Sequence, residues 1–261
     1  MYYTRRRIIK IRDFWFEDAR QNEQEKGADY VQYHDMAMIM NDKSSLVMEY
    51  TTQTIVNDIR DDMEEIIMKF KRISRSQIKE AQKEGCTSVF YYGNEMKEKK
   101  DVLKKINYGR TSIFDSKGLK DISKYNEMLS AAKEGMLAVS IGKLPTGKEC
   151  VYHVYIVGNG IARLLHSVSM FRDYESSDER NAVGRANRNL HYEDMINLKK
   201  LKVDVYDWGG YSESEKFKSI SRFKASFGGE VKEIHRYIFA VSFIGKLFAG
   251  FIYKMLVKRE H

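Results

Sequence analysis

The chain has 261 residues, of which 43% are hydrophobic, so it can fill the core of one large domain or of two small lobes. This composition excludes a disordered chain. The net charge of +8 favours an anionic partner, such as a phosphorylated cofactor, a nucleotide-linked substrate, nucleic acid or an acidic membrane surface. Two cysteines, Cys86 and Cys150, are too few and too far apart for a disulfide framework, and no histidine or cysteine cluster indicates a metal site.

The first half of the chain predicts two strands followed by helices. Apolar and aromatic residues run from 29 to 40 and, after a turn, from 46 to 56, as in neighbouring strands. Residues 58–85 then carry apolar side chains three and four positions apart, which is typical of a helix that ends at Gly85. We expect a short strand at 89–92 and helices at 95–107 and 123–133.

The second half predicts an antiparallel meander. Strands are expected at 136–141, 150–157 and 161–171, and Gly158-Asn159-Gly160 is a strong hairpin signal between the last two. A helix at 187–202 and a strand at 203–207 follow. Strands, then a helix, then a further strand indicate an α+β fold with a mixed, largely antiparallel sheet that helices flank.

The segment from 237 to 257 is apolar and aromatic, and its length approaches that of a membrane span. Lys246 and Lys254 lie inside it, however, and a lysine costs about 2.5–3.5 kcal/mol at the centre of a bilayer. We therefore expect that residues 231–261 form a C-terminal apolar, amphipathic helix and not a spanning one. It would pack on the protein or a partner subunit, or lie on an anionic membrane.

The stretch from Asn181 to Gly229 carries the candidate functional residues. Small residues around Gly184 precede the predicted helix 187–202, and backbone N–H groups at a helix N-terminus bind phosphate. The strand that follows ends in Gly209-Gly210, a break where polar side chains can converge. The pattern predicts an anion-binding site at the end of a buried strand, but it does not name a reaction.

Several stretches in this region resemble the GNAT-like acyltransferases of the FemABX type, the peptidoglycan aminoacyltransferases and their single-chain relatives. Asn181-Ala-Val-Gly184-Arg-Ala186 resembles the pyrophosphate loop of GNAT enzymes, with Asn in place of the usual leading Gln or Arg. The FemABX-like stretches are Gly184-Arg-Ala-Asn187 with Leu190-His-Tyr, Val205-Tyr-Asp-Trp-Gly-Gly210, Arg222-Phe-Lys-Ala-Ser-Phe-Gly-Gly229 and the earlier helix from Arg72 to Gly85.

The resemblance implies a GNAT-like fold and the transfer of an acyl group without a covalent intermediate. It implies that Lys224 corresponds to a lysine near the reaction centre that stabilises developing charge, and that Phe223 supports the donor pocket. Backbone N–H groups of the strand at 162–171 would cover the oxyanion. The residues expected to bind the cofactor phosphates are Asn181, Gly184, Arg185, Ala186, Asn187 and Arg188, and no metal is implied.

Acid–base chemistry has three candidates, two of which have a structural alternative. Asp207 is the first choice for a base or an acceptor-orienting carboxylate, although an aspartate before Gly-Gly also caps turns. Tyr206 would contact the acceptor or donate a proton. His191 would accept a proton, or simply bond a backbone carbonyl. Arg188 is either a phosphate contact or part of a surface salt bridge.

The leading expectation is an acyltransferase that moves an acyl group from acetyl-CoA or another acyl-CoA to an amine or hydroxyl. The expected acceptor is an anionic sugar or nucleotide-linked precursor of the cell envelope or of a polysaccharide. Two alternatives stay open: aminoacyl-tRNA as the donor, and a non-catalytic anion- or membrane-binding module. No specific nucleic-acid binding is expected, because no aromatic and basic platform is recognisable.

The expected domains are an N-terminal lobe at 1–125, a reduced GNAT-like half, and an acyltransferase lobe at 126–230. Charged residues interrupt the N-terminal apolar run, so we expect no export signal. The expected location is the cytoplasm, with peripheral contact at the inner membrane face through 237–257.

Overall fold

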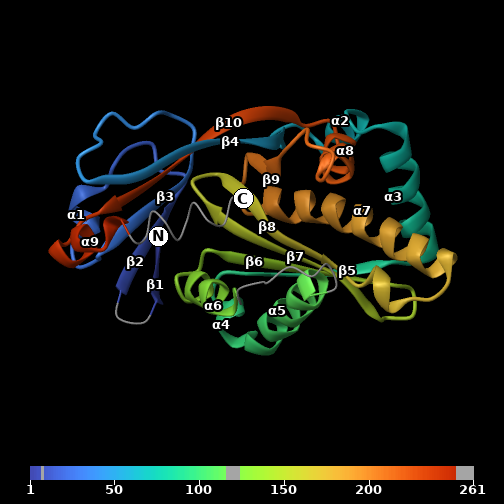
Figure 1. The fold of residues 1–261 in the computed structure, drawn as a ribbon. Coiled ribbons are helices and arrows are strands. Elements are labelled where there is room, and N and C mark those ends of the chain that lie inside the picture. Colours follow the sequence, from blue (N-terminus) through green and yellow to red (C-terminus); the bar gives the residue numbers. More distant parts are fainter. Residues whose placement is uncertain (7–8, 116–123, 251–261) are drawn as a thin grey trace. The chain divides into compact units, whose positions relative to one another are not determined.

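The computed structural model describes residues 1–6, 9–115 and 124–250, and Figure 1 shows their elements. The chain divides into two compact units, and each is described here by itself. Unit 1 comprises residues 1–53 and the chain from 232 onward, and unit 2 comprises residues 54–231. The expected boundary at residue 125 falls inside unit 2, where the strands at 87–92 and 137–143 pair with each other across it.

Unit 1 is a sheet with a small aromatic core. Its strands lie in the order β1 (Tyr2–Arg6), β2 (Ile9–Trp15), β3 (Tyr30–Met36), β10 (Glu230–Ala240) and the first part of β4 (Leu46–Asp58). β2 and β3 are parallel, whereas β1 pairs antiparallel with β2, and β10 pairs antiparallel with β3. The rings of Phe14 and Tyr33 stack at 4.7 Å in the core. The short helices are α1 (Asn22–Glu25) and α9 (Phe243–Leu247).

The expected helix at residues 231–261 is wrong over residues 231–240, which form a strand. Residues 230–240 form β10, and Tyr237 and Phe239 are fully buried in the core of unit 1. A continuous apolar run has the same appearance in a buried strand as in a buried helix, so the sequence pattern could not distinguish them. The remainder of the expected helix beyond residue 250 lies outside the described residues. None of the helices that are described has the length and apolar character of a membrane span.

Unit 2 contains the expected meander. Its strands lie in the order of the last part of β4, β9 (Val205–Tyr211), β8 (Ile161–Ser169), β7 (Glu149–Gly158), β6 (Leu137–Lys143) and β5 (Thr87–Tyr92). β5 to β8 pair antiparallel, and the hairpin turn between β7 and β8 has positive φ at Asn159 and Gly160, as such turns require. The pair β8–β9 is parallel. The expected α+β class with a mixed, largely antiparallel sheet is confirmed.

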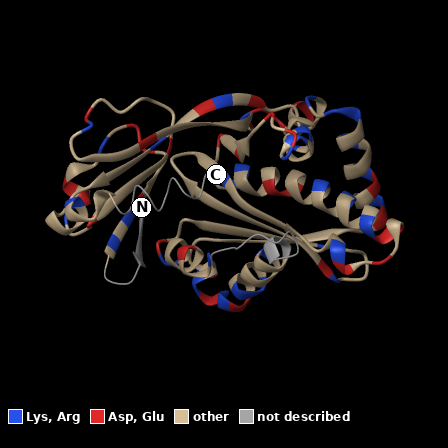
Figure 2. Cartoon of the chain, viewed as in Figure 1, with Lys and Arg blue, Asp and Glu red and all other residues tan. Residues whose placement is uncertain are grey.

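Helices cover the sheet of unit 2. α7 packs on β6 and β7 with α3 alongside it, while α5 and α6 contact β8 and β6 from the other face (Figure 1). Basic and acidic residues are interspersed along these helices, as Figure 2 shows, so the charge excess is spread over them. The helices are α2 (Met63–Met68), α3 (Arg72–Glu84), α4 (Glu95–Glu98), α5 (Lys100–Asp115), α6 (Tyr125–Lys133), the 3-10 turn Phe171–Asp173, α7 (Ser177–Lys200) and α8 (Lys218–Ala225).

Candidate active site

The residues expected to form a phosphate loop, 181–187, lie inside α7. The helix begins at Ser177, well before the expected start at Asn187. Backbone N–H groups this far into a helix donate to carbonyls four residues earlier, so they cannot also hold a diphosphate. The expected loop is therefore wrong. Gly184 suggested a loop, but a Cβ atom there would meet nothing within 4 Å, so no close approach of another group requires glycine.

The actual N-terminus of α7 is already occupied by acidic residues. Ser176 Oγ accepts a hydrogen bond from the Glu179 backbone N–H at 3.1 Å, and the Glu179 carboxylate accepts one from the Ser176 N–H at 3.3 Å. Asp178 adds a second negative charge to this first turn. These charges already complement the helix dipole, and they disfavour a diphosphate at this end.

Other expected cofactor residues have contacts within the protein. Arg185 Nη2 pairs with Glu84 Oε1 of α3 at 2.6 Å, and Ala186 is buried in a core cluster with Val151. Asn181 is exposed on α7. These contacts explain Arg185 and Ala186 as residues that join α7 to its neighbours.

The parallel strands β8 and β9 diverge at the centre of unit 2. They pair over three positions, the last of which is Arg163 with Asp207. β8 continues to Ser169 along β7, so within the described residues its other edge has no strand partner beyond Arg163. Gly209 lies just past this pairing, and the backbone there requires glycine, because its φ is +71° and a Cβ would lie 2.9 Å from the Leu164 carbonyl oxygen. An open strand edge of this kind can hydrogen-bond an extended ligand.

Asp207 lies at this divergence, but its oxygen atoms are already in use. Its Oδ2 accepts a hydrogen bond from Arg163 Nη1 at 2.9 Å, and its Oδ1 accepts from Thr54 Oγ1 and from the Gly209 N–H at 2.7 Å. The side chain is buried. A general base needs a lone pair directed at the substrate. The contacts therefore favour an orienting role for Asp207 over the base role expected first.

Lys224 reaches the same break from α8. Its Nζ donates to the carbonyl oxygen of Gly210 at 2.7 Å and to that of Gly209 at 3.2 Å. The pKa of Lys224 is lowered to about 8, mainly by burial and also by the charge of Arg163, while Asp207 opposes both. An ammonium has three N–H donors, so one remains for a ligand.

Tyr206 joins a hydrogen-bonded chain on the α7 side of the sheet. Its Oη lies 2.7 Å from Tyr155 Oη of β7 and 2.6 Å from His191 Nδ1 of α7. Tyr155 donates its own proton to Asp194 Oδ2 at 2.5 Å. Tyr155 must then accept from Tyr206, and Tyr206 must accept from His191. This direction assigns the ring proton of His191 to Nδ1 and leaves Nε2 as an acceptor.

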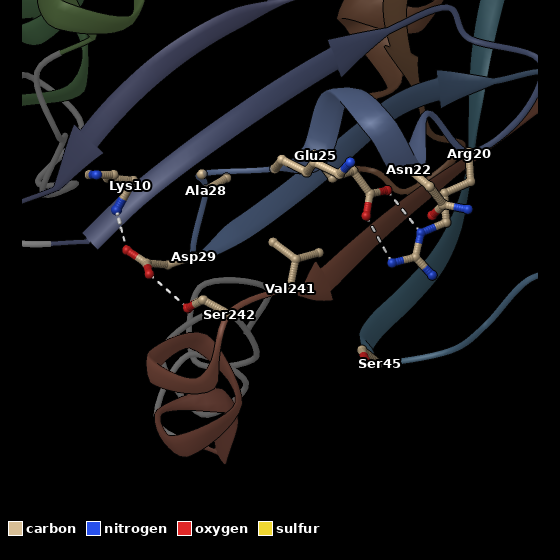
Figure 3. A pocket seen from close by; sticks show the side chains of 11 residues that line it. Lys10, Arg20, Asn22, Glu25, Ala28, Asp29, Ser45, Val241 and Ser242 are labelled. Atoms are coloured by element: carbon tan, nitrogen blue, oxygen red, sulfur yellow. Dashed lines mark hydrogen bonds and ion pairs between the residues drawn. The ribbon is translucent and has the colours of Figure 1, made fainter.

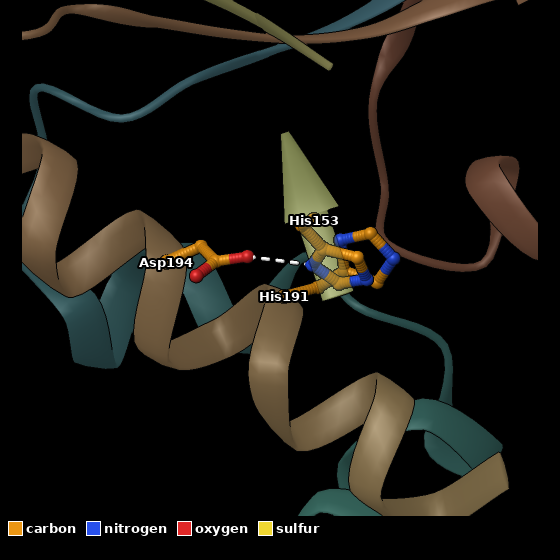
Figure 4. Close-up of side chains that lie close together, drawn as sticks. All are labelled: His153, His191 and Asp194. Atoms are coloured by element: carbon orange, nitrogen blue, oxygen red, sulfur yellow. Dashed lines mark hydrogen bonds and ion pairs between the residues drawn. The ribbon is translucent and has the colours of Figure 1, made fainter. Parts of the chain in front are cut away.

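A second histidine supports the chain. His153 Nδ1 lies 2.7 Å from Asp194 Oδ2, its Nε2 lies 2.8 Å from Asn187 Oδ1, and its ring stacks on His191 at 4.0 Å (Figure 4). The ligand-type atoms of His153, His191 and Asp194 lie within 4.8 Å of one another. Stacked rings direct their nitrogen atoms side by side and not to one point, and His153 already bonds Asp194. The geometry thus fits a hydrogen-bond network better than a metal centre.

His191 is buried and electrostatically disfavoured as a cation. Burial lowers its pKa well below the usual value, and the charges of His153, Lys224 and Arg188 lower it further. Its ring packs against Trp208 at 4.4 Å and Phe223 at 5.6 Å. Nε2 makes no hydrogen bond in the part of the chain that the structure describes. A neutral imidazole with an open nitrogen is a suitable proton acceptor.

Sequence reasoning missed Tyr155, His153, Asp194 and Arg163. A signal for two of them was present, because His153 and Tyr155 are two positions apart in a predicted strand and so share one face. Nothing in the sequence paired that face with Asp194, and the parallel register that brings Arg163 to Asp207 was not expected.

Two pockets lie near charged residues, one in each unit. In unit 2, a pocket of about 370 Å³ lies between the end of β9 and α8, lined by Tyr211, Ser212, Glu213, Lys218, Ser221, Arg222 and Ala225. In unit 1, a pocket of about 440 Å³ is drawn in Figure 3. There Arg20 makes two bonds to Glu25, and Asp29 accepts from Ser242 and from the Lys10 backbone. Because these unit 1 groups satisfy one another, we place the candidate active site in unit 2.

Comparison with solved structures identifies the fold. The structure of FemX aligns with 88% of this chain and 76% of its own, with a TM-score of 0.61 and 12% identity. The fold is GNAT-like, of the FemABX type. The C-terminal domain of a putative lysylphosphatidylglycerol synthetase from Agrobacterium fabrum aligns with 94% of this chain and 82% of its own, at a TM-score of 0.50 and 11% identity. The structure of L-PGS from Bacillus licheniformis aligns with 97% of this chain and 84% of its own, at a TM-score of 0.50 and 9% identity.

Sequence comparison adds nothing to this, since neither a protein-family model nor a curated protein matches the chain. The expected resemblance in fold is confirmed by the structural comparison. At these identities the likeness establishes the GNAT-like fold, and the chemistry must be argued from the site itself.

Proposed function

We propose that this chain transfers an acyl group from an activated donor to an amine or hydroxyl, at the point where β8 and β9 diverge. The observation that carries the proposal is that Lys224 bonds the Gly209-Gly210 break, while the His191 ring packs against Trp208 and Phe223, the residues just before Gly209 and Lys224. Lys224 is a cationic donor with a free N–H, and His191 is a neutral acceptor whose pKa responds to the charge of Lys224. The GNAT-like fold supports this class of reaction.

In the proposed reaction, the donor carbonyl lies along the open edge of β8. The acceptor nitrogen or oxygen attacks the carbonyl carbon, and His191 Nε2 takes its proton. Negative charge that develops on the carbonyl oxygen is stabilised by the Lys224 ammonium and by backbone N–H groups of β8. The bond from carbon to the leaving group then breaks, and the leaving group departs with the electron pair. The chain from Tyr206 to Asp194 holds His191 in the tautomer that this step needs.

The donor is a separate question. An acyl-CoA, acetyl-CoA included, was expected because residues 181–187 resembled a pyrophosphate loop, and that argument is lost now that these residues lie inside α7. The acidic first turn of α7 favours a donor that places no diphosphate there. Aminoacyl-tRNA and an acyl-CoA bound elsewhere in unit 2 therefore both stand as candidate donors. One similar structure is named for synthesis of lysylphosphatidylglycerol, an aminoacyl lipid, which supports an anionic cell-envelope acceptor.

The test is a turnover assay with each donor in parallel. Purified full-length protein is incubated with an amine and a hydroxyl acceptor, and release of free thiol from acetyl-CoA is compared with loss of the aminoacyl group from charged tRNA. Ribonuclease treatment should abolish only the second reaction. Lys224→Met should remove whichever activity is found. Turnover that is equal in wild type and Lys224→Met would contradict the assignment, and tight anion binding without turnover would favour the non-catalytic module.

We also propose peripheral contact with an anionic membrane through α9. This helix is held by its one small residue: a Cβ at Gly245 would lie 2.2 Å from the Asp29 carbonyl oxygen, and Tyr30 Oη donates to the Gly245 carbonyl at 2.5 Å. Phe243 and Leu247 are then 82% and 69% exposed, with Lys246 beside them. Aromatic and aliphatic side chains next to a lysine suit the interface of an acidic bilayer.

Vesicle sedimentation tests this contact. Wild-type protein should bind vesicles that contain phosphatidylglycerol, and it should bind pure phosphatidylcholine vesicles less. The double variant Phe243→Ser, Leu247→Ser should lose binding, whereas Met68→Ser, at an equally exposed position on α2, should keep it. Equal binding by both variants would show that α9 is not the contact.

A further inference from the structure

Arg188 stands out among the arginines of α7 because its N–H groups have no hydrogen-bond acceptor among the described residues. Its side chain is half-buried, and the guanidinium lies over the ring of Phe223, 4.7 Å from the ring centre. Its Nε is buried without a hydrogen bond, and neither Nη atom has an acceptor in the described part of the chain. By contrast, Arg185, one turn earlier, is bound by Glu84 and lies within 3.7 Å of Glu80.

No carboxylate compensates for this burial. The pKa of Arg188 is lowered, and burial is the one cause, whereas the pKa of Arg185 is raised by its bond to Glu84. Removing an arginine from water without supplying acceptors is costly, and buried arginines are normally paired. A further cation, Lys224, lowers the pKa of His191 as Arg188 does, so positive charge accumulates around this histidine.

The ring of Phe223 does not satisfy Arg188. A cation–π contact uses the flat face of the guanidinium, while the N–H groups point outward in the plane of the group. The edge of the guanidinium that the two Nη atoms form therefore remains open for an acceptor. Its shape matches two oxygen atoms of one carboxylate or phosphate, which it can bind through two parallel hydrogen bonds.

We infer that Arg188 is a binding residue for an oxyanion of the substrate, a carboxylate or a phosphate that lies over the edge of Phe223 beside Lys224 and His191. The inference rests on the proposed function in one respect: the bound anion belongs to a substrate only if this chain transfers acyl groups. It narrows the substrates to those that carry such an anion close to the acyl group or to the attacking nucleophile. The source is either a carboxylate, as in an amino acid or peptide acceptor, or a phosphate of a nucleotide or lipid.

The direct test follows the Arg188 Nε–H group itself by NMR. Full-length protein with ¹⁵N-labelled arginine is titrated with inorganic phosphate, with succinate, and with sodium chloride at matched ionic strength. The Arg188 signal, assigned by its loss in Arg188→Gln, should shift in a saturable way with phosphate or with succinate, and chloride should not reproduce the shift. The Arg185 signal is the internal control and should stay in place, because Glu84 already binds that group.

Each outcome decides the matter. A shift with phosphate alone supports a phosphate-bearing substrate, and a shift with succinate alone supports a carboxylate. If neither probe shifts Arg188, or if Arg185 and the chloride sample shift equally, the inference is overturned. Calorimetry with the active probe should show binding about 10- to 100-fold weaker in Arg188→Gln than in Arg185→Gln, the range of a charge-assisted hydrogen bond.

The readout is independent of turnover. Lys224→Met should lose acyl transfer but keep the saturable shift of Arg188. If the shift is found and no donor is turned over, the proposed function fails while the anion site stands. If turnover is found and Arg188→Gln keeps wild-type kinetics and probe affinity, the anion site fails while the proposed function stands.

Discussion

Arg163 and Arg188 are both placed in unit 2, yet their surroundings differ completely. Arg163 is buried against Asp207, and that carboxylate is bound in turn by Thr54 and the Gly209 backbone. Arg188 is half-buried over Phe223 and has no acceptor among the described residues. An ion pair whose hydrogen bonds are all made within the protein fixes the strands at their divergence, whereas a guanidinium without an acceptor is available to a ligand. The predictions below test this division between architecture and chemistry.

The largest expected effect is on stability. Asp207→Ala leaves Arg163 buried without its carboxylate, and breaking a buried pair in this way costs about 3–5 kcal/mol of the free energy of unfolding. Urea denaturation of the full-length protein measures it. Arg188→Gln should lose about 1 kcal/mol or less, because only its contact with the Phe223 ring is removed. If both variants lose the same amount, the proposed division between the two arginines does not hold.

The next effect is on catalysis. Lys224→Met removes a positive donor at the point where negative charge develops, so kcat should fall about 10²–10³-fold once the donor is known. Steady-state kinetics measures this, and circular dichroism should show an unchanged fold. Lys224→Arg retains the charge and should recover part of the rate. A variant without the charge that keeps wild-type kcat would place Lys224 with the architectural residues.

A smaller effect is expected for the positioning residue Tyr206. Tyr206→Phe removes the hydroxyl that joins His191 to Tyr155, so the proposed tautomer of His191 is no longer held. We expect kcat to fall about tenfold with KM unchanged, and unfolding to become easier by about 1–2 kcal/mol as the polar groups left behind lose their partner. The kinetic split separates the two roles, since a purely structural tyrosine would lower stability and leave kcat of the folded enzyme intact.

The smallest effect near neutral pH comes from the titration of Lys224, whose pKa is about 8 against a usual value of 10.5. Activity that needs the ammonium should fall as pH rises through about 8, and Lys224→Arg should remove this alkaline decline. Stability moves in the opposite direction. The unfolded chain binds more protons than the folded one between about pH 8 and 10.5, so the free energy of unfolding rises with pH across that window. Denaturation at several pH values should show this rise in wild type and not in Lys224→Met.

Much of the architecture could be predicted from local pattern. The antiparallel meander follows from alternating and continuous apolar runs, and the turn at Asn159-Gly160 follows from residues that tolerate positive φ. The Gly209-Gly210 break follows from the same local pattern, and Lys224, which the resemblance to FemABX-type enzymes indicates, contacts it. The sequence pattern predicts too late a start for α7, because Gly184 is typical of a loop, whereas the capping box of Ser176 and Glu179 sets the observed start.

The amino-acid sequence by itself determined the class of fold and the hairpin, because these depend on residues close together in the chain, and its resemblance to FemABX-type acyltransferases indicated Lys224. Only the tertiary structure decided which polar groups are satisfied. Asp207 lies 44 positions from Arg163 in the chain, and Asp194 lies 39 from Tyr155 and 41 from His153. A side chain's partner across such distances depends on strand register and helix packing, and that partner determines whether a charged residue holds the fold together or remains free to bind a substrate.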